Sequence, residues 1–266
     1  MILQKPSDLG YIPKKIVSLV PSQTELLYYF GLEQETIGIT KFCVHPEVWF
    51  QTKPKAGGTK TINFDVIYQL QPDLIIANKE ENVKDQIEQL ALTYNVWLTD
   101  VNNFADALAM IKDLACLTAK EKEADTLIKE INSRFDQLLP KHQTTNHKLK
   151  TAYLIWRNPY MAVGGDTFIN DMLLKCGFEN VFANKTRYPE TTVTALQTAN
   201  LPTGQAGCQL LLLSSEPYPF KQKHIDELSV QLPNCKIILV DGELFSWYGS
   251  RMLLSADYFM NLINSL

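Results

Sequence analysis

The stretch from Thr118 to Pro140 reads TAKEKEADTLIKEINSRFDQLLP, and it decides the fold. Its apolar residues recur at helical spacing and form one stripe, made of Leu127, Ile128, Ile131, Phe135, Leu138 and Leu139. Thr118 and Glu121 have the spacing of a capping box, and Pro140 is expected to end the helix. Such a helix is about 30 Å long. Unlike a Gly/Ser linker it would tie two lobes together rigidly, which indicates a ligand held between lobes that move little.

Short apolar strands alternate with helices on both sides of this stretch. The strands are predicted at 16–20, 36–40, 73–77 and 96–99 before it, and at 151–156, 161–163, 209–214 and 236–240 after it. A helix is expected to start after Pro21, with Ser22 and Glu25 as its capping box.

This alternation predicts an α/β fold with central parallel sheets and helices on both faces. The expected organisation is two Rossmann-like lobes joined by one long bridging helix. The N-terminal lobe would cover residues 1–117, the bridging helix 118–140 and the C-terminal lobe 141–266.

Composition excludes several classes of function. The chain has 266 residues, is 45% hydrophobic and 20% charged, and carries a net charge of −4. It has no dense cluster of lysine or arginine, so no nucleic-acid partner is expected. No apolar run approaches the about 20 residues needed to span a membrane, so the protein is not expected to be membrane-spanning. The cysteines are odd in number and form no CxxC pair, which argues against a disulfide framework and against structural zinc.

Aromatic side chains gather at the predicted carboxyl ends of the strands, where open α/β sheets bind their ligands. Such rings, with a few polar groups among them, suit a flat and largely apolar ligand such as a corrinoid. The residues predicted to bind it are Phe42, His45, Trp49, Trp156, Arg157, Tyr160, Tyr218, Phe220, Phe245, Trp247 and Tyr248. The alternative is that some of these rings only close the core around the helix ends.

Individual polar residues also have two interpretations each. His45 could ligate a metal through its neutral imidazole, or it could be a turn histidine before Pro46. No residue is assigned as a metal ligand. Arg157, Arg187 and Arg251 are forked anchors for a polar ligand group or members of salt bridges.

Two glycine pairs are expected to form tight turns. Gly57-Gly58 and Gly164-Gly165 lack the spacing of the phosphate-binding motifs, although a phosphate nest is the alternative.

Six segments occur in a characteristic order. They are KIVSLVPSQTELLYYFGL (Lys15–Leu32), the Gly57-Gly58 pair, LQPDLIIA (Leu70–Ala77), the helix over 118–140, VGGDTFINDMLLKCGFENV (Val163–Val181) and LPNCKIILVDGELFSWYGSRML (Leu232–Leu253). This ordered set resembles the helical-backbone substrate-binding proteins of ABC importers, a family that serves cobalamin (vitamin B12), iron-siderophores and haem. The resemblance covers roughly Lys14 to Leu262 and is nearest to the cobalamin-binding members.

The resemblance implies a ligand-binding component of an ABC importer that has no intrinsic cofactor and makes or breaks no bond. It would hold a metal chelate in the cleft between the lobes, with a cobalamin-like corrinoid favoured and an iron-siderophore or haem next. Its partners would be that small molecule and an ABC permease, and a monomer is expected. In this family one carboxylate per lobe docks onto permease arginines, which implies docking roles for Glu80, Glu81 and Glu216. The alternative role for these three glutamates is that of solvated carboxylates in loops.

The cellular location of the protein and its function each have alternatives. The resemblance implies a periplasmic or cell-envelope protein, but MILQKPSDLGYIPKK lacks the features of a secretory signal, so a removed signal and a cytoplasmic protein both stay open.

One rival function is that of an intracellular corrinoid or haem carrier that is not coupled to transport. The other is a metal-dependent enzyme on the same fold, which would need His45, Glu190 and Asp241 to converge on one metal. No catalytic residue is assigned, because the GxSxG and HExxH motifs are absent.

Overall fold

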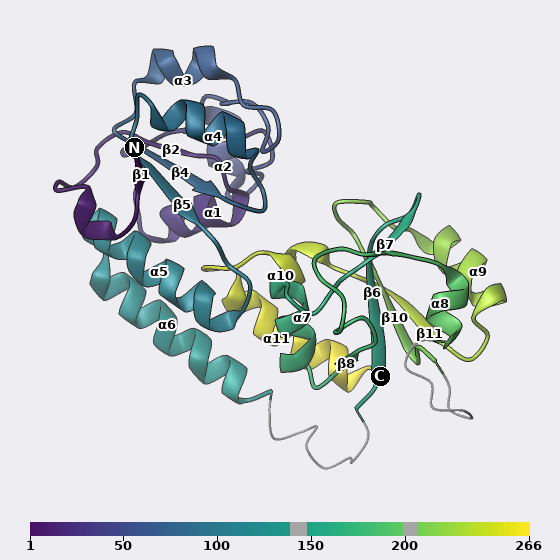
Figure 1. The fold of residues 1–266 in the computed structure, drawn as a ribbon. Helices are drawn as coiled ribbons and strands as arrows, with labels where there is room; N and C mark the ends of the chain where they lie inside the picture. Colours follow the sequence, from purple (N-terminus) through teal and green to yellow (C-terminus); the bar gives the residue numbers. More distant parts are fainter. Residues whose placement is uncertain (139–147, 199–206) are drawn as a thin grey trace. The chain divides into compact units, whose positions relative to one another are not determined.

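The computed structural model describes residues 1–138, 148–198 and 207–266 (Figure 1). These residues form two compact units, each assembled from separate stretches of chain. Unit 1 contains Met1–Val101, Ala105–Ile131 and Trp247–Leu253. Unit 2 contains Asn102–Phe104, Asn132–Ser246 and Leu254–Leu266. Unit 1 therefore includes a short segment from near the C-terminus.

The sheet of unit 1 has five strands, all parallel, in the order β1-β5-β4-β2-β3. Their bounds are β1 Ile2–Leu3, β2 Ile16–Ser18, β3 Thr36–Ile39, β4 Leu74–Asn78 and β5 Val96–Thr99. All five residues of the central strand β4 are buried, as expected for a parallel strand covered on both faces. The sequence did not predict β1, because two residues are too short a run to show a period.

Helices cover both faces of this sheet. They are the 3₁₀ turn η1 (Pro6–Asp8), α1 (Pro21–Tyr29), α2 (Glu47–Thr52), α3 (Phe64–Leu70) and α4 (Lys84–Ala91). Ile67 of α3 and Ile87 of α4 pack on Val17 and Ile75 in one apolar cluster, and Figure 1 shows α1 on the opposite face. The helix α2 lies between the strands predicted at 36–40 and 73–77.

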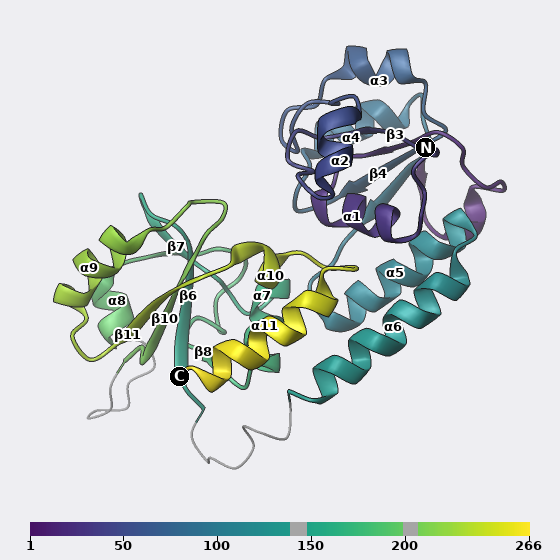
Figure 2. The same cartoon turned by 180° about the vertical axis from the view of Figure 1, so that it is seen from behind.

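The helix predicted over 118–140 is shorter than expected, and its start is different. The chain forms α5 (Phe104–Thr118) and then α6 (Glu121–Asp136), which lie side by side in both Figure 1 and Figure 2. Thr118 is the last residue of α5 and not an N-cap, because its hydroxyl donates to the Leu114 carbonyl oxygen at 2.7 Å. Leu139 and Pro140, where the helix was predicted to end, lie outside the described residues.

A left-handed residue separates the two helices. Ala119 has φ +54°, and the Lys120 N–H donates to the Ala115 carbonyl oxygen at 2.9 Å, which is the outer hydrogen bond of a Schellman motif. Glycine is the usual residue at this position, so the alanine gave no signal that one helix ended there. The apolar stripe itself was predicted correctly, since Leu127, Ile131 and Phe135 of α6 are buried.

The sheet of unit 2 is mixed. Its strands are β6 (Lys150–Trp156), β7 (Tyr160–Ala162), β8 (Glu179–Asn180), β9 (Glu190–Thr191), β10 (Leu210–Ser214) and β11 (Lys236–Val240). The order is β11-β10-β6-β7-β9, with β8 also paired to β6. Strands β11, β10, β6 and β8 run parallel, whereas β7 and β9 add to the edge in antiparallel pairs.

Two layers of helices cover this sheet. The helices α8 (Val193–Thr198) and α9 (Gln222–Gln231) pack on one face through Leu196 and Leu228. On the other face lie α7 (Phe168–Lys175), α10 (Gly242–Ser246) and α11 (Met252–Asn264). There the ring of Phe245 lies 5.2 Å from that of Tyr153 and 4.6 Å from that of Phe259. The predicted α/β class with two sheet-centred units is thereby confirmed.

Candidate functional site

Five of the predicted ligand-binding residues lie together in unit 2. They are Trp156 at the end of β6, Arg157 after it, Tyr160 at the start of β7, and Tyr218 and Phe220 in the loop after β10. Strands β6 and β10 are parallel neighbours, so their carboxyl ends meet at one edge of the sheet. The rings of Trp156 and Tyr218 meet edge to face at 5.8 Å, and those of Tyr218 and Phe220 at 4.8 Å.

A sixth residue, His224, completes this group, which we call the aromatic–arginine cluster. Its Nδ1 accepts the Lys221 N–H at 2.8 Å, and its Nε2 lies 3.4 Å from the Tyr218 hydroxyl. Burial, followed by the positive charge of Arg157, lowers the pKa of His224. The ring is therefore neutral at pH 7 with its proton on Nε2, and it positions Tyr218. The sequence showed it only as a histidine in the first turn of a helix.

Arg157 holds the polar side of the cluster in place. Its Nη2 donates to Oε2 of Glu227 on α9 at 2.5 Å. Hydrogen bonds with Tyr218 and with Tyr160 raise the pKa of Arg157 above its already high value, so the guanidinium stays charged. Phe220 is buried within the cluster, whereas Trp156 is 40% exposed. The cluster thus presents an indole face, a cation and phenol hydroxyls at one surface.

The predicted residues of unit 1 form a smaller group. The His45 ring lies 5.5 Å from that of Trp247, edge to face, and Trp247 is largely buried. Phe42 is 50% exposed, with the Lys41 ammonium 5.2 Å from its ring centre. His45 and Phe42 are therefore the predicted ligand-binding residues of unit 1 that keep accessible surface.

Trp49 and Phe245 are core residues, which corrects their predicted role as ligand contacts. Each is 0% exposed. Trp49 packs edge-on against Tyr28 at 5.3 Å in unit 1, and Phe245 packs between Tyr153 and Phe259 in unit 2. A ring with no exposed surface has nothing to offer a ligand, so the alternative of core closure holds for these two.

The segment Trp247–Leu253 is fixed to unit 1 by a buried ion pair. Arg251 Nε and Nη2 donate to the two carboxylate oxygens of Glu25 at 2.8 and 2.9 Å. Their side chains are 8% and 18% exposed. This pairing makes Arg251 a structural residue, and it replaces the predicted capping box of Glu25 with Ser22, since α1 has no side-chain cap. Tyr248 of the same segment is also buried, and burial raises its pKa.

The predicted docking carboxylates occupy ordered turns. After β4, the N–H groups of Glu80 and Glu81 donate to Oδ1 of Asn78 at 2.8 and 3.1 Å. After β10, Oε1 of Glu216 accepts from the Ser246 hydroxyl at 2.8 Å. All three glutamates are half-buried.

The glycine pair of unit 2 serves close backbone packing. The N–H groups of Gly164 and Gly165 donate to the carbonyl oxygens of Arg187 and Lys185 at 2.7 and 2.8 Å. These donors are used, so they cannot form the nest that a phosphate would need. Gly58 likewise donates to the Thr61 carbonyl oxygen at 2.7 Å.

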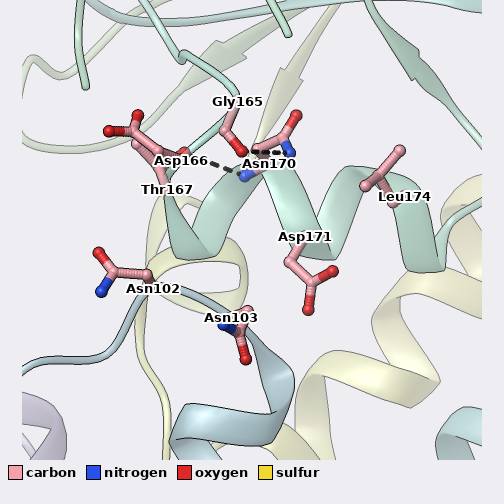
Figure 3. A pocket seen from close by; sticks show the side chains of 8 residues that line it. All are labelled: Asn102, Asn103, Gly165, Asp166, Thr167, Asn170, Asp171 and Leu174. Carbon is pink, nitrogen blue, oxygen red and sulfur yellow. Dashed lines mark hydrogen bonds between the residues drawn. The ribbon is translucent and has the colours of Figure 1, made fainter. Parts of the chain in front are cut away.

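Unit 2 also contains a pocket that the sequence did not predict. It has a volume of about 430 Å³ and is lined by Asn102, Asn103, Gly165, Asp166, Thr167, Asn170, Asp171 and Leu174 (Figure 3). Asp171 accepts the Phe104 N–H at 2.7 Å, and the Asn170 amide donates to the Gly165 carbonyl oxygen at 2.9 Å. Its polar groups come from sequence positions more than 60 residues apart, so no local motif marked it. Arg187 lies beside it and donates to Asn102 Oδ1 at 3.0 Å.

The described residues contain neither a metal-binding cluster nor a membrane-spanning helix. Across residues 1–138, 148–198 and 207–266, no three side chains of His, Cys, Asp or Glu lie close enough together to hold a metal ion. Within the same ranges no helix has both the length and the apolar character of a membrane span.

The sequence matches a known protein family. Residues 16–197, well over half of the chain, match the family described as periplasmic binding protein.

Two relatives show how far the sequence similarity extends. An uncharacterised ABC transporter substrate-binding lipoprotein of Bacillus subtilis is 30% identical over 199 residues, which are 71% of this chain and 62% of that protein. The match thus spans less than two thirds of that relative. A vitamin B12-binding protein of Pectobacterium atrosepticum is 24% identical over 257 residues, covering 92% of this chain and 87% of that protein.

Solved structures show the same fold. The periplasmic vitamin B12 binding protein of Vibrio cholerae has a TM-score of 0.77 and 17% identity, with 95% of this chain and 97% of that chain covered. A periplasmic haem-binding protein of Pseudomonas aeruginosa has a TM-score of 0.79 and 16% identity, with 96% and 92% covered. At these identities the likeness shows the fold and not the ligand.

Proposed function

The chain belongs to the periplasmic binding protein family, and on that premise we propose that it is the ligand-binding component of an ABC-type importer. Proteins of this family bind substrates for transporters and are not enzymes, so the predicted absence of catalysis follows from membership. The proposal includes a periplasmic or envelope-attached location and an ABC permease as partner.

The proposed ligand is a metal chelate, with a cobalamin-like corrinoid first and haem or an iron-siderophore next. The observation that carries this choice is the aromatic–arginine cluster. A corrinoid has a broad flat face and a rim of amide groups. The exposed indole of Trp156 suits the face, while Arg157 and the Tyr160 and Tyr218 hydroxyls suit amide oxygens on the rim. Several similar proteins are named vitamin B12-binding proteins, which supports the same order.

In unit 1, Phe42 and His45 are the proposed ligand contacts, and the buried Trp49 is not one of them. Phe42 supplies exposed aromatic surface, and His45 supplies an imidazole whose ring is steadied by Trp247. We do not assign His45 as a ligand of the chelated metal. Haem and corrinoids both offer an axial position to imidazole, so spectroscopy of the bound ligand is the way to detect such a bond.

The proposed permease contacts are Glu80 and Glu81 in unit 1 and Glu216 in unit 2. Each follows a strand in a turn that is held by side-chain hydrogen bonds. A carboxylate held in one orientation suits paired recognition by a partner's arginines better than a freely rotating one. Glu→Gln changes at these positions should slow uptake and leave ligand affinity unchanged.

The experiment is calorimetric titration of the full chain with cyanocobalamin, cobinamide, haem and a ferric siderophore. We expect saturable binding of the corrinoids at micromolar or lower concentration. Quenching of Trp156 fluorescence, lost in Trp156→Phe, should report binding at the cluster. Binding of haem alone would move the ligand assignment to haem, and no binding to any of the four would refute the metal-chelate proposal.

A matched pair of arginine variants tests the cluster. Arg157→Ala should weaken corrinoid binding at least about 10-fold, because a charged, forked donor is lost. Arg134→Ala is the control, since Arg134 makes a similar ion pair with Asp257 at 2.7 Å on α6 and α11. Equal affinities for the two variants would show that the cluster does not contact the ligand.

A further inference from the structure

Two cysteines lie side by side in unit 2, and neither belongs to the proposed ligand site. Cys208 comes two residues before β10, and Cys235 directly precedes β11. The two strands are parallel neighbours, and the Lys236 N–H donates to the Gln209 carbonyl oxygen at 2.9 Å. The pairing of these strands therefore fixes both cysteines at the amino-terminal edge of the sheet.

The distance between the two sulfurs is short. Cys235 Sγ lies 3.7 Å from Cys208 Sγ, and both are free thiols in this structure. Neighbouring strands are about 4.8 Å apart and one residue rises about 3.3 Å, so a stagger of one residue gives a Cα separation of about 6 Å. That separation is in the range that disulfides require. Closing the sulfurs to bonding distance needs rotation about χ1 and only a small movement of the backbone.

The two thiols differ in access and in acidity. Cys208 is 5% exposed within the apolar cluster beneath β10. Cys235 is half-buried. The hydrogen bond between them lowers the pKa of the Cys235 thiol, and that bond together with burial raises the pKa of the Cys208 thiol. Cys235 is thus the more accessible of the two thiols and the one that loses its proton more readily.

We propose that Cys208 and Cys235 form a reversible intramolecular disulfide when the protein meets a disulfide oxidant, either a small molecule or a protein. The Cys235 thiolate attacks one sulfur of the oxidant, whose S–S bond breaks and releases one thiol. The Cys208 sulfur then attacks Cys235 Sγ in the mixed disulfide and releases the second thiol. Two cysteine thiols lose two electrons and two protons, and the oxidant disulfide gains both to become two thiols.

The disulfide would act on stability and leave ligand binding unchanged. It closes a loop of about 28 residues, which restricts the unfolded chain. The aromatic–arginine cluster lies at the opposite, carboxyl ends of β6 and β10, so its geometry does not depend on the bond. We expect the Tm of the oxidised protein to rise by about 5–10 °C, with ligand affinity within about twofold of the reduced form.

The test uses the full chain incubated with glutathione disulfide and then unfolded for thiol counting. The count should fall from five to three, because Cys43, Cys116 and Cys176 stay reduced. A tryptic map without reductant should join peptide 188–221 to peptide 224–236. Cys116→Ser, which removes the exposed cysteine, should give the same joined peptides. A count that stays at five, or a bond between any other pair, would overturn the proposal.

Single variants test the order of attack. Cys208→Ser should accumulate a glutathione adduct on Cys235, since the resolving sulfur is absent. Cys235→Ser should gain no adduct at position 208, because that sulfur is buried. An adduct at Cys208 in the second variant would contradict the order, and the thiol count of the unmodified chain decides the disulfide itself if either variant fails to fold.

Discussion

Replacing Arg251 with alanine is expected to destabilise unit 1 by about 3–4 kcal/mol. The side chain connects the Trp247–Leu253 segment to α1 through two hydrogen bonds to Glu25, at 2.8 and 2.9 Å. It also lies 4.8 Å from the ring centre of Trp247. The substitution removes all three interactions at once.

The magnitude follows from burial. With side-chain exposures of 8% and 18%, Arg251 and Glu25 are largely removed from water, so Glu25 would be left as a poorly solvated, unpaired carboxylate. Breaking a buried pair from one side costs about 3–5 kcal/mol, and the partial exposure of Glu25 places the value at the lower end. The loss of the contact with Trp247 adds about 0.5–1 kcal/mol.

The assay is urea unfolding followed by tryptophan fluorescence, because Trp49, Trp97 and Trp247 all belong to unit 1. The control is Arg134→Ala, whose partner Asp257 is 67% exposed and which should cost no more than about 1 kcal/mol. A double-mutant cycle with Glu25→Gln should return a coupling energy of about 2 kcal/mol. If Arg251→Ala costs no more than Arg134→Ala, the ion pair does not hold the segment.

Three further predictions are also measured by urea unfolding and tryptophan fluorescence, with Trp156 as the reporter in unit 2. Ala119→Gly should stabilise the protein by about 1 kcal/mol, since the left-handed conformation penalises alanine. The same change at Ala109, which is exposed in the middle of α5, should destabilise it by about 1 kcal/mol. Changes in stability of the same sign at both positions would contradict the turn geometry. Gly165→Ala should cost about 2–3 kcal/mol because its Cβ would meet the Ala183 carbonyl oxygen, and a neutral result would mean that this turn adapts. Because the pKa of His224 is lowered in the folded state, the unfolded state binds the proton of this histidine at a higher pH, so stability should fall as pH drops below about 6.5. The stability of His224→Gln should fall less steeply over the same range. Parallel curves of stability against pH for the two proteins would refute the assignment.

Apolar runs predicted the strands well, because a strand buried on both faces must be apolar at every position. Leu74–Asn78 and Leu210–Ser214 lie within one residue of their predicted bounds. Helix ends were predicted less well. Ser22 with Glu25 and Thr118 with Glu121 both match the capping-box pattern, but Glu25 pairs with the distant Arg251, and the Thr118 hydroxyl bonds to Leu114 within α5. A pattern of two residues cannot encode such a competing interaction.

The site was predictable where topology alone determines position. Trp156 and Tyr218 come together because both lie at the carboxyl ends of strands that are parallel neighbours. Exposure was not predictable, since Trp49 and Phe245 have the same residue types as the exposed Trp156 and Phe42, yet are buried. The contribution of His224 depends on the tautomer that the Lys221 N–H selects, and only coordinates reveal that.

The docking of Trp247–Leu253 on unit 1 also has a consequence for synthesis. A ribosome that has made the first 131 residues has not yet made a complete unit 1, because Glu25 still lacks its arginine. At about 5–20 residues per second, roughly 6–24 s pass before Arg251 is added. During that time nascent unit 1 is held by its sheet and helices alone. It acquires its last segment only after nearly all of unit 2 has been translated, so the two units cannot mature strictly one after the other.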